Sequence, residues 1–257
     1  MKKSAVLAVV LTAAISMTIA REQVDKRLPA AKDGLVTIEN VAGSVRVNGW
    51  DRDEVAITGM LGKETKELVF TNTGNRTTIR VEVLNHTRNL EGSDLVIQVP
   101  RSSRVEIIVI SATAAVTDLQ GELIISSVSG NVETMGAVRE AEVSTLSGTI
   151  QFRTDGTLAK GLFKSVSGKI DVAASLDAAG RFEFETVSGS VDLRLPKRTS
   201  ADFDVSSFSG DITNDFGEKA TKVDQFLPSL DLKFSIGGGG ARVSVQTLSG
   251  SIHLRAE

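Results

Sequence analysis

The chain has 257 residues with 29 basic and 32 acidic side chains, a net charge of −3, so it lacks the basic surface that nucleic-acid binding requires. It contains no cysteine, two histidines, one tryptophan and no tyrosine. Disulfides are therefore excluded, and the side chains that most often serve catalysis or metal binding are scarce. From composition we expect no catalytic set, no metal site and no cofactor.

The first twenty residues have the order of a secretory signal peptide. Lys2 and Lys3 precede an apolar run from Ala5 to Ile15, and small residues then precede the charged Arg21. The run is shorter than the roughly 20 residues that span a bilayer, so we expect cleavage near Arg21 rather than a retained membrane anchor. The mature chain would then be exported to the periplasm or the cell surface, without a transmembrane span.

The part up to residue 100 contains strand-like segments of uneven length. Alternating or β-branched runs predict strands at 35–38, 45–47, 55–58, 77–83 and 95–99, and Pro100 ends the last one because it cannot donate to a ladder. We expect residues 21–100 to be a less regular half that caps a single domain, 21–257. The lone Trp50 is a possible contact residue, or a cap over the end of the domain.

A six-residue phrase then recurs through residues 101–257: Ser or Thr, an apolar residue, Ser, Gly, any residue, and Val or Ile. Its glycines stand at 130, 148, 168, 189, 210 and 250, in steps of 18, 20, 21, 21 and 40 residues. A looser copy, with Gly43, opens the domain. Such self-similarity is typical of a repeat architecture.

The positions around each glycine alternate as two short strands joined by a tight corner would. We therefore predict an all-β solenoid with coils of about 20 residues, in which glycine lets successive coils approach closely. The alternative is an antiparallel β-sandwich. The residues two after each glycine should point inward: Val132, Ile150, Ile170, Val191, Ile212 and Ile252.

The last glycine step is twice the usual length. We expect a degenerate coil around Leu230–Phe234 to fill it, and the segment from Phe216 to Leu230 to be a loop inserted between coils. The final repeat stops three residues before the chain does, so we expect it to leave an open C-terminal edge. This edge, which includes His253, Arg255 and Glu257, is the predicted site of self-association or of strand addition by a partner.

Two carboxylates raise the possibility of a polysaccharide-active enzyme. Asp171 and Asp192 occupy equivalent places in adjacent coils and would lie close on one face, as paired glycosidase carboxylates must. The other interpretation is an ordinary solvated column, because Glu133, Gln151, Thr213 and His253 share the register. Neither His86 nor His253 has a nucleophile or a metal-ligand pattern beside it, so we expect both to be plain surface residues.

Several of these segments resemble a bacterial family of unknown function named "putative adhesin". The similarity is carried by the opening Ile38–Val45, by Asn48–Asp51, by the Ser-Gly-x-Val/Ile units, by Leu95–Pro100 and by Gly237–Gly240. The resemblance implies a β-helix-like domain that is exported or membrane-associated, and it brings no catalytic residues.

Taken together, the sequence predicts a non-enzymatic, exported envelope protein that presents an interaction surface or scaffold. The alternative is a polysaccharide-binding or polysaccharide-active solenoid protein. An envelope protein or a polysaccharide is the expected kind of partner, and nucleic acid is not.

Overall fold

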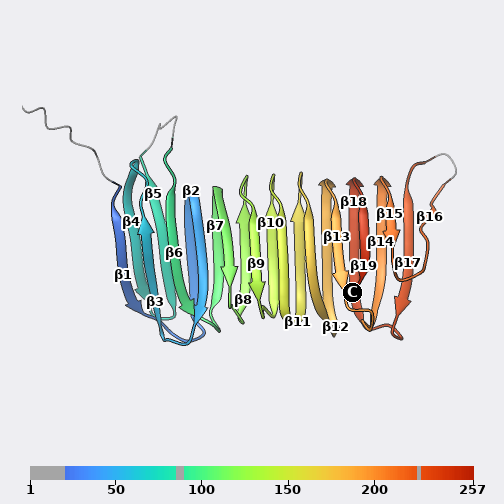
Figure 1. Ribbon diagram of the computed structural model, residues 1–257, viewed down its shortest axis with the longest axis horizontal. Helices are drawn as coiled ribbons and strands as arrows, with labels where there is room; N and C mark the ends of the chain where they lie inside the picture. The colour runs from blue at the N-terminus through green and yellow to red at the C-terminus, as the bar shows by residue number, and fades with distance from the viewer. Residues whose placement is uncertain (1–20, 85–89, 225–226) are drawn as a thin grey trace, which may run out of the picture.

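The computed structural model describes residues 21–84, 90–224 and 227–257, so the predicted signal peptide and His86 lie outside the described residues. Within these ranges the protein consists of nineteen β-strands and no helix, arranged side by side along one long axis (Figure 1). Successive coils pair in parallel, strand on strand. This arrangement confirms the predicted β-solenoid and rules out an antiparallel sandwich.

The solenoid is flattened, and its hydrogen-bonded sheet folds at the corners into two faces. The first face contains, in spatial order, β4(Thr65–Thr73), β5(Arg76–Val83), the start of β2(Leu35–Trp50), the start of β7(Arg104–Thr117), β8(Glu122–Ser127), β10(Glu140–Thr145), the end of β11(Ile150–Ser165), the end of β12(Ile170–Ser188), β18(Ala241–Ser249), β14(Ala201–Ser209), β17(Leu230–Ile236) and β16(Thr221–Lys222).

The second face lies opposite, across the core. It contains β1(Gln23–Pro29), β3(Glu54–Met60), β6(Ser93–Pro100), the ends of β2 and β7, β9(Val132–Gly136), the starts of β11 and β12, β13(Val191–Leu195), β19(Ile252–Ala256) and β15(Ile212–Asn214). Each coil thus contributes one strand to each face.

Alternating side chains fill the space between the faces with one continuous apolar core. Of the six residues predicted to point inward, Val132, Ile150, Ile170, Val191 and Ile252 are fully buried. Ile212 is only partly buried, because β15 stands at the end of the second face. The strand register around the glycines is therefore confirmed.

The repeated glycines are needed because neighbouring coils touch at the corner. A Cβ atom added to Gly148, Gly168 or Gly189 would overlap the carbonyl oxygen of the glycine one coil before it, at Gly130, Gly148 and Gly168 respectively. No residue with a side chain fits so close to a neighbouring backbone. Of the glycines in this row, only Gly43 has a positive φ, at 102°.

The first end of the solenoid is closed by antiparallel strands. β2 is a complete coil that lies between the β5–β6 coil and β7. Beyond that coil, β4 pairs antiparallel with β5, β3 with β6, and β1 with β3. The segment predicted to begin and cap the stack therefore contains coils of its own, with the antiparallel strands outside them.

The second end differs from the prediction, because the last repeat is not at the edge. β18 is inserted between β12 and β14, and β19 between β13 and β15, so both have parallel partners on each side. The expected C-terminal edge is wrong for this reason: His253 faces Asp192 on one side and Thr213 on the other, and Arg255 pairs with Arg194 inside the sheet.

The degenerate unit and the predicted insertion also lie elsewhere. Leu230–Ile236 forms β17, which runs antiparallel to β14 and covers the end of the stack, instead of filling a coil. The segment from Phe216 to Leu230 belongs to the same cap, although residues 225 and 226 lie outside the described part. Phe234 stacks on Phe203 with 4.6 Å between ring centroids, which extends the core into the cap.

Candidate interaction surface

A row of apolar side chains runs along the outside of the glycine corner, one from each of eight neighbouring coils. We call it the corner ridge; in spatial order it consists of Val41, Ile110, Val128, Leu146, Val166, Val187, Leu248 and Phe208. All but the half-buried Val41 are between 41% and 54% exposed. Eight coils at the usual strand spacing make the ridge about 34 Å long.

Backbone geometry fixes the ridge on the outside. Each ridge residue follows a buried residue that points inward, which is Asn40 before Val41, Val109 before Ile110 and a Ser or Thr in the other coils. Its own side chain must therefore point to solvent. Leu146 N donates to the carbonyl of Ser127, and Val166 N donates to that of Thr145, both at 3.1 Å, which keeps the row in step. The fold does not require apolar residues at these positions, because their side chains point to solvent. Single exposed apolar residues on a protein surface need no explanation, but a continuous row of them does.

Sequence reasoning noted this apolar position but did not assign it to the surface. The signal was present, because the inward residues stand three and five places before each glycine. The residue two places before it, with the opposite parity, has to point outward. The ridge is thus a candidate interaction surface that could have been predicted from the sequence.

The Ser and Thr residues beneath the ridge belong to the corner and not to a ligand site. The row is buried, and it consists of Ser127, Thr145, Ser165, Thr186, Thr247 and Ser207. Ser127 Oγ accepts from Gly130 N at 3.0 Å and donates to Gly130 O at 3.1 Å, so it satisfies the corner backbone. The hydroxyls of Thr145, Ser165, Thr186 and Thr247 have no hydrogen-bond partner, yet they occupy the same inward place.

A surface groove of about 900 Å³ follows the ridge toward the second end. The ridge residues Val166, Val187, Leu248 and Phe208 line one side of it, and Val223 and Asp231 of the cap line the other. Charged groups are few here: Lys164 Nζ lies 2.8 Å from Glu185 Oε2, which raises the pKa of Lys164 mainly through that hydrogen bond. The groove is therefore an apolar strip bordered by a neutralised ion pair.

On the second face, the two candidate catalytic carboxylates do come together. Asp171 and Asp192 are register partners on β12 and β13, and both are buried rather than solvated, at 6% and 4% exposure. Lys169 Nζ lies 2.9 Å from Asp171 Oδ2 and 3.5 Å from Asp192 Oδ2, and Arg194 contacts both carboxylates. Arg255 Nε is 2.9 Å from Asp192 Oδ1, although no N–H points at that oxygen.

This charge cluster is a poor glycosidase site. Burial raises the pKa of Asp171, but the hydrogen bond from Lys169 and the charges of Lys169, Arg194 and Arg153 outweigh it and hold the pKa below its usual value. A glycosidase needs one carboxylic acid whose pKa is raised, so that it can protonate the leaving group. Asp171 and Asp192 instead belong to a network of ion pairs that joins three coils.

Trp50 is not a cap over the end of the solenoid. It is the last residue of β2, which lies between β6 and β7, so it stands at the side of the stack. Its indole Nε1 donates to the carbonyl of Glu54 at 2.9 Å, and the Arg52 guanidinium lies 4.9 Å from the ring centroid. With Lys32, Arg101 and Gln120 it lines a polar surface hollow of about 610 Å³. A contact role for Trp50 remains a prediction.

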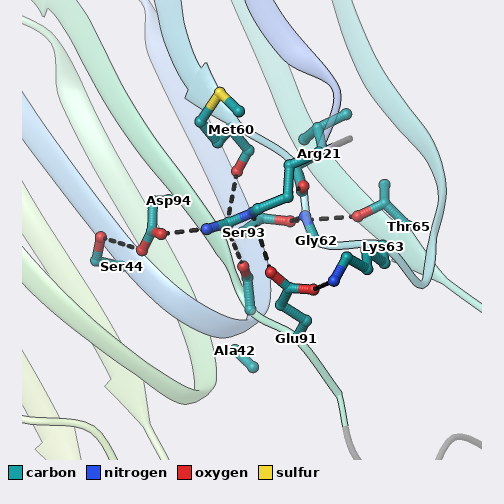
Figure 2. A network of polar contacts seen from close by, with 12 residues as sticks. Arg21, Ala42, Ser44, Met60, Gly62, Lys63, Thr65, Glu91, Ser93 and Asp94 are labelled. Atoms are coloured by element: carbon teal, nitrogen blue, oxygen red, sulfur yellow. Dashed lines mark hydrogen bonds and ion pairs between the residues drawn. The ribbon is translucent and has the colours of Figure 1, made fainter. Parts of the chain in front are cut away.

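A polar network holds the first strand onto the rest of the fold (Figure 2). The Arg21 guanidinium donates to the carbonyl of Gly92 at 2.6 Å and to Asp94 Oδ2 at 3.1 Å, and its Nε lies 3.5 Å from Glu91 Oε1. Ser44 donates to the other oxygen of Asp94 at 2.8 Å. Since every charge here has a partner within the chain, we assign the network a structural role.

The described part of the chain lacks two further features. In it, no three His, Cys, Asp or Glu side chains gather as metal ligands would. No helix among residues 21–84, 90–224 and 227–257 has the length and hydropathy needed to cross a membrane.

Comparison with solved structures finds distant likenesses. The chain is similar to a "putative cell adhesion protein" from Clostridium sporogenes at 11% identity and a TM-score of 0.44, covering 92% of this chain and 100% of that one. It is similar to a "putative adhesin" from Bacteroides fragilis at 12% identity and a TM-score of 0.45, covering 91% and 98%. A "putative lipid binding protein" from Parabacteroides distasonis gives 11% identity and a TM-score of 0.36, covering 91% and 95%.

The comparison with protein families gives a match, and it covers most of the regular coils. A search of curated proteins finds no match. Residues 137–255 match the family Toastrack DUF4097, and this range begins just before β10 and ends in β19, including the cap and the inserted last coil. Residues 137–255 of this chain are therefore similar to the Toastrack DUF4097 family, in keeping with the family of unknown function that the sequence resembles.

Proposed function

We propose that the protein is an exported, non-enzymatic component of the cell envelope whose solenoid presents an adhesin-like interaction surface. The observation that carries the proposal is the corner ridge: eight coils each place an apolar side chain outward in one straight row. Contiguous apolar surface on a soluble protein marks sites of interaction. The non-enzymatic part of the proposal draws on the lowered pKa of Asp171, which does not suit an acid catalyst.

The surface is tested by placing a photoreactive amino acid at Val187, in the ridge, in cells that produce the full chain. Met135 provides the matched control, because it is an apolar residue on β9 of the second face and is more exposed than Val187, at 58% against 45%. We expect adducts of defined mass from position 187 and none from position 135. Equal labelling at the two positions, or none at either, would contradict the proposal.

Export is tested separately by mass spectrometry of the protein from the envelope fraction. The expected N-terminus is near Arg21, because the basic start and the apolar run of residues 5–15 fit a cleaved signal peptide. Intact Met1 on most of the protein would contradict export by this route.

A further inference from the structure

We infer that the corner ridge is the contact surface for a second copy of this chain, with the two ridges antiparallel. The inference rests on the proposed function, since it names the partner of the same surface. Five features of the structure support it: the area offered by the ridge, its period, the sizes of its side chains, the charges beside it, and the edge strands at the two ends of the solenoid.

The area is suitable for a modest dimer. Eight half-exposed aliphatic or aromatic side chains, with the serines beside them, offer roughly 600–700 Å² on each copy, close to the ~800 Å² that one partner gives to a standard interface. The exposed serines of the corner, such as Ser147 and Ser167, form a small, uncharged border. A second copy therefore covers the apolar row without burying charge.

The ridge is complementary to itself only in the antiparallel sense. A second copy has the same coil spacing, so its side chains fall in step with those of the first. When the ridges run in opposite directions, Phe208 faces Val41, Leu248 faces Ile110, and Val166 faces Leu146 across a central two-fold axis. Phe208, the largest ridge residue, then meets the small Val41, and Leu146 meets the smaller Val166. The other two pairs, Leu248 with Ile110 and Val187 with Val128, are matched in size. In a parallel pair, two Phe208 rings would meet at one end and hold the ridges apart at the other.

The charges beside the ridge fit the same arrangement. The outward residues of the first face next to the ridge are, in spatial order, Glu39, Ile108, Ser126, Ser144, Lys164, Glu185, Gln246 and Ser206. A two-fold axis that reverses the ridge brings Lys164 opposite Ser144 and Glu185 opposite Ser126. No like charges meet, so the antiparallel pair has no electrostatic penalty at this border.

The ends of the solenoid, by contrast, are poorly suited to self-association. The first end presents β1, with the exposed charges of Asp25, Lys26 and Arg27. At the second end β17 and β16 cover the edge of β14, and β15 on the second face is an edge strand of only three residues. Charged or covered edge strands discourage strand addition. Lateral pairing through the ridge therefore replaces the C-terminal edge as the expected mode.

The first experiment measures the mass of the purified full chain by sedimentation at rising concentration. We expect a reversible dimer. In Val166→Asp two carboxylates come near the two-fold axis, so the dissociation constant should rise roughly tenfold or more. Met135→Asp, also at an exposed apolar site, should leave it unchanged, and melting curves show whether both variants are folded. A wild-type chain that stays monomeric, or equal effects of the two changes, would overturn the inference.

The second experiment tests the orientation with single cysteines, which is possible because the chain has none of its own. A short bismaleimide should link Val41→Cys to Phe208→Cys when the two variants are mixed, and should link neither variant to itself. A Phe208→Cys homodimer, or no mixed product, would rule out antiparallel ridges.

The outcomes separate this inference from the function beneath it. If the purified chain is monomeric while position 187 gives adducts with another molecule in cells, the ridge is an interaction surface and only the second copy is wrong. If position 187 gives adducts of twice the chain mass, both stand.

Discussion

At the corner of each coil, the next coil can stack only because glycine has a hydrogen atom where every other residue has a Cβ atom. A methyl group at Gly168 would overlap the carbonyl oxygen of Gly148, and that oxygen belongs to backbone held on both sides. We expect Gly168→Ala to lower the free energy of unfolding by about 1–3 kcal/mol, as overpacking does. Urea unfolding followed by circular dichroism measures the change.

The neighbouring serine provides the control for this substitution. Ser167 is exposed at the same corner, so Ser167→Ala should stay within about 0.5 kcal/mol of wild type. Equal stability of Gly168→Ala and Ser167→Ala would mean that the coils do not approach as closely as the structure shows.

Asp171 gives the fold a dependence on acid. Its carboxylate is buried against Lys169 and Arg194, so we expect Asp171→Asn to cost about 1–3 kcal/mol at neutral pH. The pKa of folded Asp171 lies below its ordinary value of 3.8, so the unfolded chain binds more protons in the interval between the two pKa values. Stability therefore rises with pH there, and the contribution of the carboxylate is lost as pH falls through the folded pKa.

The difference between wild type and Asp171→Asn should accordingly be constant from about pH 7 to 5 and shrink below pH 3.8. Unfolding in urea at several pH values tests it. Glu133→Gln is the matched control, since Glu133 is exposed in the same column and should show no such pattern. A difference that grows on acidification would contradict the assigned ion network.

Among the elements, the cap strand β17 is expected to protect the second end. Phe234 on β17 stacks on Phe203 of β14, so Phe234→Ala removes apolar contact and should cost about 3 kcal/mol. With the cap loosened, the β14 edge becomes available to other strands, so light scattering should show association. The exposed Lys233, one residue away, is the control: Lys233→Ala should behave as wild type in both measurements.

The strands themselves could be predicted from the sequence, but not the order in which they stack. Val132, Ile150 and Ile170 showed their inward position by a fixed offset from glycine, because the side-chain period of a strand is local. The place of Ile252 next to Val191 could not be read in this way. Every corner has nearly the same local sequence, so the phrase around Gly250 fits equally well after Gly189 or after Gly210, and only the reversal at β17 decides.

For the candidate surface, too, the sequence predicts the local orientation of each side chain but not which coils are neighbours. The apolar character of Val166 and Leu248 is visible in the sequence, and the parity of the strand puts them outside. That these two residues stand two coils apart depends on the stacking order. Likewise, Asp171 and Asp192 were expected on one face, but the contact of Arg255 with Asp192 could not be predicted, because Arg255 reaches this carboxylate only through the insertion of the last coil beside β13.

For the molecule as a whole, this insertion makes the end of the chain a central structural part. β18 and β19 hold the body, at β12 and β13, to the cap unit of β14, β15 and β17. Pairing between residues as far apart as Val191 and Ile252 closes a long loop, and such contacts form slowly. The cap unit is therefore expected to dock only after β18 and β19 have been made.

A chain shortened to end at Gly240 tests this role. If the last coil were at an edge, its removal would cost one coil and leave the rest folded. Because it is internal, we expect residues 201–236 to lose their protection from hydrogen exchange and the melting temperature to fall, while the coils from β2 to β11 keep their protection. Removing residues 23–29 is the control, since β1 pairs only with β3 and its loss should affect that end alone. The contrary outcome is direct docking of β14 on β12, with residues 201–236 still protected. That result would mean that equivalent corners are interchangeable and that the inserted coil is not what joins the cap to the body.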